Sequence, residues 1–446
     1  MPLDRDATVP GTIRIRAARL ASKRGTRPPL IGLTGGPGQA GVTFLEDYNF
    51  ILPTVGRDLV VLDQRGTGGS GLLRCPTLEG RIERGVERST AACGERLGAR
   101  RSFYTSADSA EDLEALRIRL GAPRIALYAV SYGTRVAVEY ARRHPDRVER
   151  MILDSPIGID APDPFARETI AAIGPVVRRV CRIGCGRADA HPIGDLRRLV
   201  ARLRRSPIRQ RVRRDGRRVT VKVTAEDVLG LLVSSDLFSE LMRRIPPAVR
   251  SALGGNPKPL VGLKLSLGGA EDGESPSEFS AAVYAATTCE ESPFAWDPAA
   301  DPATRKLQAR AALGALPASQ FAPFDPRSGR RFGPLSLCGS WPARVRPAVT
   351  PPPLPTSVPT LVLSGELDLR TPNAEARRLA TVLHGKLVTE RGVGHSVLGT
   401  DFNGCATPAV EDFLAGRKVG RCARGGASIG VARSALRRQD RYSLRP

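Results

Sequence analysis

The segment RIALYAVSYGTRVA, residues 124–137, decides how this chain is interpreted. A short apolar run ends at Ser131, small residues stand two positions before and after it, and a helix-like segment follows at once. A strand, sharp turn and helix of this kind form a nucleophile elbow, in which a strained backbone lifts the serine hydroxyl clear of the sheet. The usual pattern is Gly-x-Ser-x-Gly, and here Ala129 replaces the first glycine. A buried serine between a strand and a helix is the alternative interpretation.

A serine hydroxyl is a weak nucleophile, so the chain must also supply a base. Of the four histidines, His395 lies in the glycine-flanked sequence GVGHS, directly after the last expected strand. An imidazole in such a loop can reach Ser131, and we therefore predict that His395 is the base. The other histidines are expected to have structural or surface roles: His144, His191 and His384.

The residue that orients the base should fall between the serine and the histidine in chain order. The apolar run at residues 361–363 leads into SGELD, which contains two carboxylates, Glu366 and Asp368. We predict Asp368 as the orienting acid and keep Glu366 as the alternative. The order serine, acid, histidine, each after a strand at one sheet edge, is more specific than any single motif.

The transition state of acyl transfer also needs donors for its oxyanion. One predicted donor is the backbone N–H of Tyr132, the residue after the nucleophile. The second should come from the early glycine-rich loop TGGPGQAG, residues 34–41, with Gly36 as the expected donor. A phosphate-binding loop is the alternative, but the Gly-Lys-Ser/Thr ending of a P-loop is absent from this sequence.

Strand and helix patterns alternate at both ends of the chain, which predicts one mostly parallel α/β sheet flanked by helices. Residues 157–340 are mainly helical and contain a hairpin around Asp215-Gly216, so we expect a large lid inserted into the sheet domain. The predicted divisions are 1–156 and 341–424 for the sheet domain, 157–340 for the lid and 425–446 for a loosely ordered basic tail. Three smaller expectations are a strand at 12–16, a helix at 277–286, and an N-cap at Asp108 or Ser109.

The net charge of +23 raises the question of nucleic-acid binding. Only seven of the 68 basic residues are lysine, and the arginines are spread along nearly the whole length. The densest basic stretch, residues 202–222, has no interleaved aromatic residues that could stack on bases. We therefore expect no nucleic-acid partner. No apolar run reaches the roughly 18 residues of a transmembrane helix, so we expect no integral membrane segment.

The eight cysteines are even in number and widely spaced in an enzyme-sized chain, which favours disulfides and an oxidising compartment. Free buried thiols are the main alternative. A zinc site is disfavoured because neither a CxxC pair nor a histidine cluster accompanies the cysteines. Spacing alone leaves the pairing open. The positions are Cys75, Cys93, Cys181, Cys185, Cys289, Cys338, Cys405 and Cys422.

Six motifs together resemble the prolyl iminopeptidase and tripeptidyl aminopeptidase family of α/β-hydrolases. They are GGPG at 35–38, DQRGTGGS at 63–70, VSYGT at 130–134, CGSWP at 338–342, GELD at 365–368 and GHS at 394–396. The closing motifs are similar to the C-terminal domain of the tripeptidyl aminopeptidase-like branch, and the likeness runs from residue 2 to about residue 424. The resemblance implies an α/β-hydrolase fold. Acyl transfer by Ser131, His395 and Asp368 requires no cofactor or metal, so we expect neither. The resemblance also implies four disulfides: Cys75–Cys93, Cys181–Cys185, Cys289–Cys338 and Cys405–Cys422.

The resemblance further implies a serine hydrolase that removes short units from peptide N-termini. The lid would then need carboxylates for the substrate ammonium group, and Glu290 and Glu291, beside Cys289, are the candidates; a salt bridge to one of the many arginines is the alternative. The expected substrate is a peptide or a small ester. A carboxylesterase or lipase with the same triad is one competing hypothesis, and a non-catalytic basic binding protein on this fold is another.

Relatives of this kind are often exported, so we expect an extracellular or cell-envelope protein. Residues 1–24 are mixed and charged and contain no apolar core of a signal peptide, so the export signal is expected to be absent from this chain. A cytoplasmic location is the alternative. The oligomeric state and the length of the released unit do not follow from the sequence.

Overall fold

A computed structural model of the chain describes residues 1–23, 25–79, 85–158, 163–185, 191–214, 217–271, 275–292, 294–347, 350–400, 404 and 406–420. Three sequence predictions therefore lie outside the described residues: the turn at Asp215-Gly216, the Cys405–Cys422 disulfide and the basic tail at 425–446.

A seven-stranded sheet forms the centre of the fold, in the order β1-β3-β2-β4-β5-β8-β9. Only β1 is antiparallel to its neighbour, β3, and every other pair is parallel. Short apolar runs buried on both faces form the inner strands, as is typical of parallel sheets. The mostly parallel α/β architecture predicted from the sequence is thereby confirmed. The strands are β1 (Ala17–Leu20), β2 (Leu30–Leu33), β3 (Leu59–Leu62), β4 (Ile125–Val130), β5 (Val148–Asp154), β8 (Thr360–Gly365) and β9 (Lys386–Glu390).

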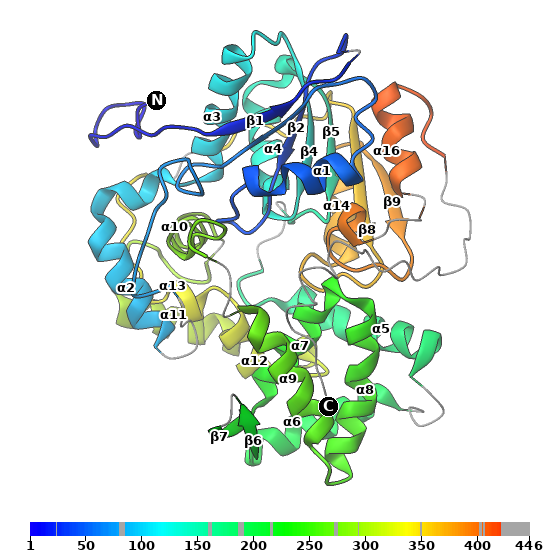
Figure 1. The fold of residues 1–446 in the computed structure, drawn as a ribbon. Helices are drawn as coiled ribbons and strands as arrows, with labels where there is room; N and C mark the ends of the chain where they lie inside the picture. Colours follow the sequence, from blue (N-terminus) through cyan, green and yellow to red (C-terminus); the bar gives the residue numbers. More distant parts are fainter. Residues whose placement is uncertain are drawn as a thin grey trace.

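Helices cover both faces of the sheet (Figure 1). Alternate strand residues divide between two apolar cores, one on each face. One face packs against α3 (Ser106–Arg119), α4 (Tyr132–Arg143) and α14 (Asn373–Val382). The other face packs against α1 (Leu45–Ile51), α15 (Val397–Thr400) and α16 (Ala406–Ala415).

The mainly helical insertion consists of two packed groups. The first has its own apolar core and lies beyond the carboxyl edge of the sheet (Figure 1). It comprises α5 (Arg167–Gly184), α6 (Pro192–Arg205), the hairpin β6 (Ile208–Arg214) and β7 (Arg217–Val223), α7 (Ala225–Ser234), the short 3-10 helix η4 (Ser235–Leu237), α8 (Ser239–Leu253) and α9 (Lys258–Glu271).

The second group joins the insertion to the N-terminal third of the chain. It consists of α10 (Ala281–Glu291), α11 (Pro302–Gly314), α12 (Pro326–Phe332) and α13 (Leu335–Cys338), and it packs partly against α2 (Val86–Leu97) and η2 (Gly98–Phe103). The short 3-10 helix η5 (Ala318–Phe321), between α11 and α12, packs instead against α5 of the first group. Two further short 3-10 helices are η1 (Val42–Phe44) and η3 (Pro145–Arg147). The division of the chain at residues 156, 340 and 424 stays a prediction.

Three local predictions were wrong because tertiary contacts set the boundaries. The edge strand is β1 rather than residues 12–16, since Ala17–Leu20 pairs with β3 while Ile13 is buried against the N-terminal residues. Helix α10 begins at Ala281 rather than 277, because Glu278 and Phe279 pair instead with the glycine-rich loop. Helix α3 is capped by Thr105, and Asp108 is the partner that completes its capping box.

The motif DQRGTGGS forms the support beneath the glycine-rich loop. The Asp63 carboxylate accepts hydrogen bonds from the N–H groups of Val42 (2.8 Å) and Gly69 (2.8 Å). Gln64 Nε2 donates to the carbonyl of Thr34 at 2.9 Å. The motif therefore fixes both ends of the loop that is expected to hold the oxyanion.

Arg65 of the same motif is a fully buried cation. Its Nε and Nη2 donate to the two carboxylate oxygens of Asp112 at 2.7 and 2.6 Å, and Nη1 donates to the carbonyl of Phe103 at 2.6 Å. A bidentate arginine with further acceptors satisfies most of its donors, which is what allows its burial.

Replacing Arg65 by methionine is expected to lower the free energy of unfolding by about 3–5 kcal/mol, because the buried Asp112 loses its main partner. Urea unfolding followed by circular dichroism measures the change. Arg74→Met is the matched control, since Arg74 pairs with Glu79 at the surface and its loss should change little. Equal destabilisation by the two substitutions would contradict this account.

Candidate active site

Ser131 lies in the sharp turn between β4 and α4. Its backbone has φ 54° and ψ −124°, a conformation that is strained for any residue other than glycine. Its N–H donates to the carbonyl of Asp154 at the end of β5, at 2.9 Å. The strained turn that the sequence predicted is therefore present around Ser131.

The two small residues around the turn meet different surroundings. A Cβ on Gly133 would lie 2.6 Å from the carbonyl oxygen of Leu33 and 2.7 Å from that of Thr34, so only glycine fits at this position. Ala129 instead is fully buried in the apolar core on one face of the sheet, where its methyl group packs with other side chains. The departure from the usual pattern thus falls where a methyl group can be accommodated.

The glycine-rich loop passes directly beside the nucleophile. A Cβ on Gly35 would lie 2.9 Å from Ser131 Cβ and 3.4 Å from Ser131 Oγ. Gly36 follows with φ +105°, and Tyr132 is the first residue of α4, where backbone N–H groups have no acceptor within the helix. Both predicted oxyanion donors therefore belong to segments adjacent to Ser131, and their donor role stays a prediction.

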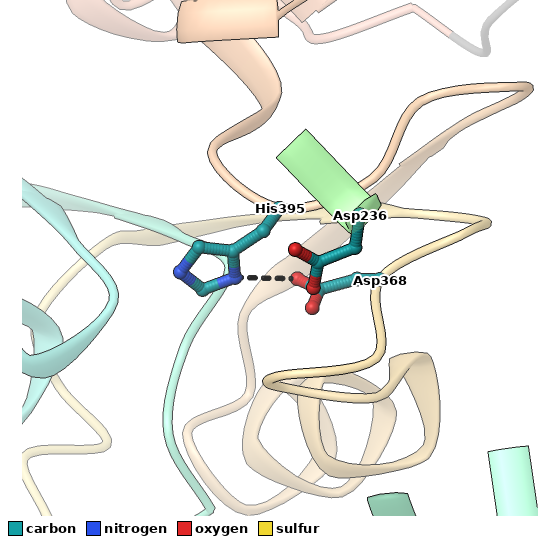
Figure 2. A group of neighbouring side chains, drawn as sticks. All are labelled: Asp236, Asp368 and His395. Atoms are coloured by element: carbon teal, nitrogen blue, oxygen red, sulfur yellow. Dashed lines mark hydrogen bonds and ion pairs between the residues drawn. The ribbon is translucent and has the colours of Figure 1, made fainter. Parts of the chain in front are cut away.

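His395 and Asp368 form a buried hydrogen-bonded pair (Figure 2). His395 Nδ1 lies 3.0 Å from Asp368 Oδ2. The Asp368 carboxylate also accepts from the N–H of Arg370 (3.0 Å) and of Thr371 (2.9 Å), and from Thr371 Oγ1 (2.8 Å). These donors hold the carboxylate in the orientation that contacts the imidazole.

Glu366, the alternative acid, has a different partner. Its carboxylate forms an ion pair with Arg179 of helix α5. Because Asp368 contacts His395 and Glu366 contacts Arg179, the geometry favours Asp368 as the orienting acid.

The charge environment favours a protonated imidazole. Burial alone would lower the pKa of His395, but the Asp368 charge and hydrogen bond, together with Asp236, raise it above its ordinary value. The imidazolium holds the pKa of the Asp368 carboxyl below its usual value, against the effect of burial. Nδ1 is occupied by Asp368, so Nε2 is the nitrogen that remains for proton transfer.

When the pH is lowered, we expect activity to be half lost at a pH above about 6.5, the usual histidine pKa. The base must be neutral to accept the serine proton, and a raised pKa keeps His395 protonated up to a higher pH. Rates of hydrolysis or of active-site phosphonylation are measured from about pH 5 to 9 at constant ionic strength. They give the acid limb of the pH–rate profile, the part in which the rate falls as the pH is lowered. A limb at or below pH 6.5 would contradict the raised pKa.

Asp154 and Ser155, which the sequence interpretation missed, connect the three parts of the site. The Asp154 carboxylate accepts from the N–H groups of Val397 (2.7 Å) and Leu398 (3.0 Å), just beyond His395. Ser155 Oγ accepts from the N–H of Ser396 (2.9 Å), and its carbonyl accepts from Thr371 Oγ1 (3.0 Å). Since the Asp154 carbonyl also binds Ser131 N–H, the loops of nucleophile, acid and base all meet at the end of β5. The position of Asp154 at a strand's carboxyl end was an available signal.

Asp236, also missed, comes from η4 in the insertion (Figure 2). It is buried, and its carboxylate lies beside the Asp368–His395 pair. Nothing in the local sequence could identify it, because its place depends on how the insertion docks.

One group of side chains in the described part of the chain could geometrically hold a metal: the ligand atoms of Asp236, Asp368 and His395 lie within 4.8 Å of one another. These atoms already have partners, however. His395 Nδ1 contacts Asp368, and the Asp236 carboxylate accepts from Arg370 Nε at 2.9 Å. The imidazole and the two carboxylates are therefore already engaged in hydrogen bonds with each other and with Arg370. A metal ion would have to displace the Arg370 guanidinium from Asp236.

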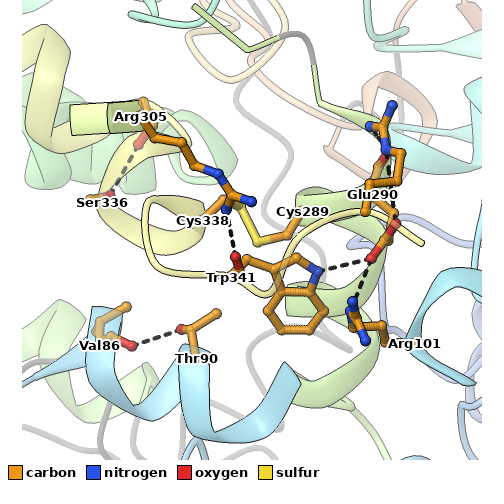
Figure 3. The surroundings of a disulfide bond; sticks show 11 residues. Val86, Thr90, Arg101, Cys289, Glu290, Arg305, Ser336, Cys338 and Trp341 are labelled. Carbon is orange, nitrogen blue, oxygen red and sulfur yellow. Dashed lines mark hydrogen bonds and ion pairs between the residues drawn. A yellow bond between two sulfur atoms is a disulfide. The ribbon is translucent and has the colours of Figure 1, made fainter. Parts of the chain in front are cut away.

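Glu290 and Glu291 have separate surroundings. Glu290 accepts from Trp341 Nε1 at 2.9 Å and lies 3.5 Å from Arg101 Nε, beside the Cys289–Cys338 disulfide (Figure 3). Glu290 thus forms an ion pair with Arg101, which is the alternative to amine binding that the sequence left open.

Glu291 faces the elbow helix. It accepts from Ser106 Oγ at 2.6 Å and from the Tyr132 hydroxyl at 3.4 Å, and Arg135 Nε lies 3.5 Å away. Burial raises the pKa of its carboxyl. Amine binding stays a prediction for both residues, and the contact with Tyr132 makes Glu291 the better candidate.

Three cysteine pairs are joined in the structure: Cys75–Cys93, Cys181–Cys185 and Cys289–Cys338. They correspond to three of the four pairs that the resemblance implied. Within the described ranges, no helix combines the length and the hydrophobicity needed to cross a membrane.

Comparison with known families gives two matches. Residues 28–177 match the family described as alpha/beta hydrolase fold, and residues 326–422 match the family described as TAP-like protein.

Three similar proteins carry peptidase names. Serine protease Hip1 of Mycobacterium tuberculosis is 26% identical over 417 residues, covering 86% of this chain and 77% of that protein. Tripeptidyl aminopeptidase of Streptomyces lividans is 30% identical over 182 residues, 35% of this chain and 34% of that protein. A probable proline iminopeptidase of Streptomyces coelicolor is 32% identical over 125 residues, 28% of this chain and 32% of that protein.

Proposed function

We propose that the chain is a serine hydrolase that cleaves short units from the N-termini of peptides, because residues 28–177 match the alpha/beta hydrolase fold family and residues 326–422 match the TAP-like family. One observation carries the proposal. The strained Ser131 turn and the buried Asp368–His395 pair are tied to the same two residues at the end of β5. The peptidase names of the similar proteins support the choice of an amide substrate.

In the proposed mechanism Ser131 Oγ attacks the substrate carbonyl carbon and transfers its proton to His395 Nε2. Asp368 orients the imidazole and stabilises its charged form. The N–H groups of Tyr132 and Gly36 bind the oxyanion of the tetrahedral intermediate. The imidazolium then protonates the leaving amine, and water, deprotonated by His395, hydrolyses the acyl-enzyme and regenerates Ser131.

Exopeptidase specificity requires a site for the free ammonium group of the substrate. We assign this to Glu291, whose carboxylate lies next to the Tyr132 side chain. The Glu291 carboxylate pairs with Arg135 at 3.5 Å and accepts from Ser106 Oγ, and a substrate ammonium would add a second cation to this buried group.

We further propose that the protein works in an oxidising compartment, outside the cell or in the cell envelope. Three disulfides support this, because such bonds are rare in reducing cytosol.

A fluorophosphonate probe tests the proposed nucleophile. Labelling of the native enzyme, mapped by peptide mass spectrometry, is expected at Ser131. Absence of labelling there would overturn the hydrolase assignment and favour a non-catalytic binding protein on this fold.

A panel of aminoacyl and tripeptidyl amides, their N-acetylated counterparts and simple acyl esters then tests the substrate class. The free-amine amides are expected to be cleaved and the acetylated ones to be cleaved far more slowly. Turnover of esters without turnover of any free-amine amide would overturn the peptidase proposal and favour an esterase.

A further inference from the structure

Asp236 of η4 brings the insertion directly beside the Asp368–His395 pair (Figure 2). Its side chain is completely buried, although it comes from a segment more than 100 residues before Asp368 in the chain. We propose that Asp236 is a positioning residue that holds the acid loop and the base loop together, so that the insertion is part of the active site. The inference rests on the proposed serine hydrolase function and extends it.

Hydrogen bonds from both loops end on Asp236. Its carboxylate Oδ2 accepts from the N–H groups of Leu369 (3.2 Å) and Arg370 (3.1 Å), the two residues after Asp368. Its backbone carbonyl accepts from the N–H of His395 at 3.2 Å. One residue of the insertion thus fixes the backbone next to the acid and the backbone of the base itself.

Packing around these bonds leaves little freedom. A Cβ on Gly394 would collide with the Asp236 carbonyl, so the base loop runs directly against η4. Leu367 and Leu369, on either side of Asp368, are buried in the apolar core of the insertion rather than in the sheet cores. Displacing the insertion would therefore pull on the acid loop through its side chains as well as through its hydrogen bonds.

Asp236 also sets the charge balance at the pair. Arg370 Nε donates to Asp236 Oδ1 at 2.9 Å, and the guanidinium offsets the charge of one of the two adjacent buried carboxylates, Asp236 and Asp368. With the imidazole neutral, the cluster of two carboxylates and one guanidinium carries a net negative charge, and protonation of His395 removes it. A buried excess of negative charge favours the imidazolium.

In the described part of the chain, the charged and titratable groups that face this position come from five elements or loops. They are Asp368 and Arg370 on the acid loop, Asp236 on η4, Tyr284 on α10, which interacts with Arg370, Asp154 on β5, whose carboxylate binds the backbone just beyond His395, and Glu375 on α14, whose carboxyl interacts with Asp368 and has a pKa raised to about 7 chiefly by burial.

The test follows the rate of fluorophosphonate labelling of the full-length protein as a function of pH, which needs no knowledge of the substrate. In Asp236→Asn the limiting rate at high pH is expected to fall by about 10²-fold, because a neutral amide holds the acid-loop N–H groups and Arg370 less tightly than the carboxylate and misplaces Asp368. The acid limb is expected to move to lower pH. In Arg370→Gln the limb should move to higher pH, because Asp236 is no longer balanced, while Arg370→Lys keeps it near the native position.

Asp227→Asn is the matched control. It removes a carboxylate from the start of α7, the helix that precedes η4, where Asp227 pairs with Lys264. Both the limiting rate and the limb should remain native. Melting temperatures of all variants show which of them are folded.

Unchanged rate and limb in Asp236→Asn would overturn the inference, and so would limbs that move in the same direction in Asp236→Asn and Arg370→Gln. If Asp236→Asn does not fold, the two Arg370 variants decide. The proposal is overturned if the acid limb of Arg370→Gln lies at the same pH as that of Arg370→Lys. A native enzyme that is not labelled at all would overturn the proposed function itself, whereas a labelled native enzyme with an indifferent Asp236→Asn overturns only the inference.

Discussion

Ser131→Ala is expected to lower kcat by about 10⁴–10⁶-fold and to abolish fluorophosphonate labelling. The turn that holds Ser131 has positive φ and lies against the glycine-rich loop, so no other hydroxyl takes the same position after the substitution. Residual turnover would come from binding and from the oxyanion donors alone. Progress curves with the substrate found in the panel measure the loss.

The same substitution separates chemistry from folding. Ser131 Oγ is not used to cap helix α4, and the serine N–H that binds Asp154 is retained in alanine. Secondary structure and melting temperature should therefore stay close to native. Thr134→Val is the control for loss of a hydroxyl near the turn. It removes the hydroxyl of Thr134, one turn along the same helix, where Oγ1 donates to the Ser131 carbonyl. Retention of full activity in Ser131→Ala would show that the hydrolase site lies elsewhere.

Most of the loops that carry the proposed catalytic residues were predictable because they follow from local sequence. The elbow needs only a strand, a serine between small residues and a helix, and Gly133 shows why: two carbonyl oxygens occupy the space of its Cβ. The glycine-rich loop is equally local. His395 could be chosen because only one of four histidines follows a strand in a glycine-flanked loop.

The contacts that complete the site depend on tertiary docking and left little trace in the sequence. Asp236 lies in an ordinary helical stretch, and its contact with the acid loop follows only once η4 docks there. The start of α10 was misplaced for the same reason, since Ala40 N–H binds the Glu278 carbonyl and draws that segment out of the helix. The choice between Asp368 and Glu366 also required the fold, because both are carboxylates in one loop and only their partners distinguish them.

Asp368→Asn is expected to lower kcat by about 10⁴-fold with little change in KM. The Asp368 carboxylate accepts from two backbone N–H groups, from Thr371 Oγ1 and from the imidazole, so an amide would present its own donor to a group that needs an acceptor. The imidazole would then be held in the wrong tautomer, with Nε2 carrying the proton that it must accept from Ser131. The raised pKa of His395 should also be lost, so the acid limb moves to lower pH.

Glu366→Gln is the matched control, two residues earlier in the same loop. It removes a carboxylate that pairs with Arg179 at the edge of the insertion, so kcat should stay within a few-fold of native. Steady-state kinetics of both variants across pH compare the two carboxylates directly. A large loss in Glu366→Gln with a mild one in Asp368→Asn would reverse the assignment of the acid. A large loss in Asp368→Asn with an unmoved acid limb of kcat/KM would mean that Asp368 orients His395 without setting its charge, since that limb reports the imidazole pKa in the free enzyme.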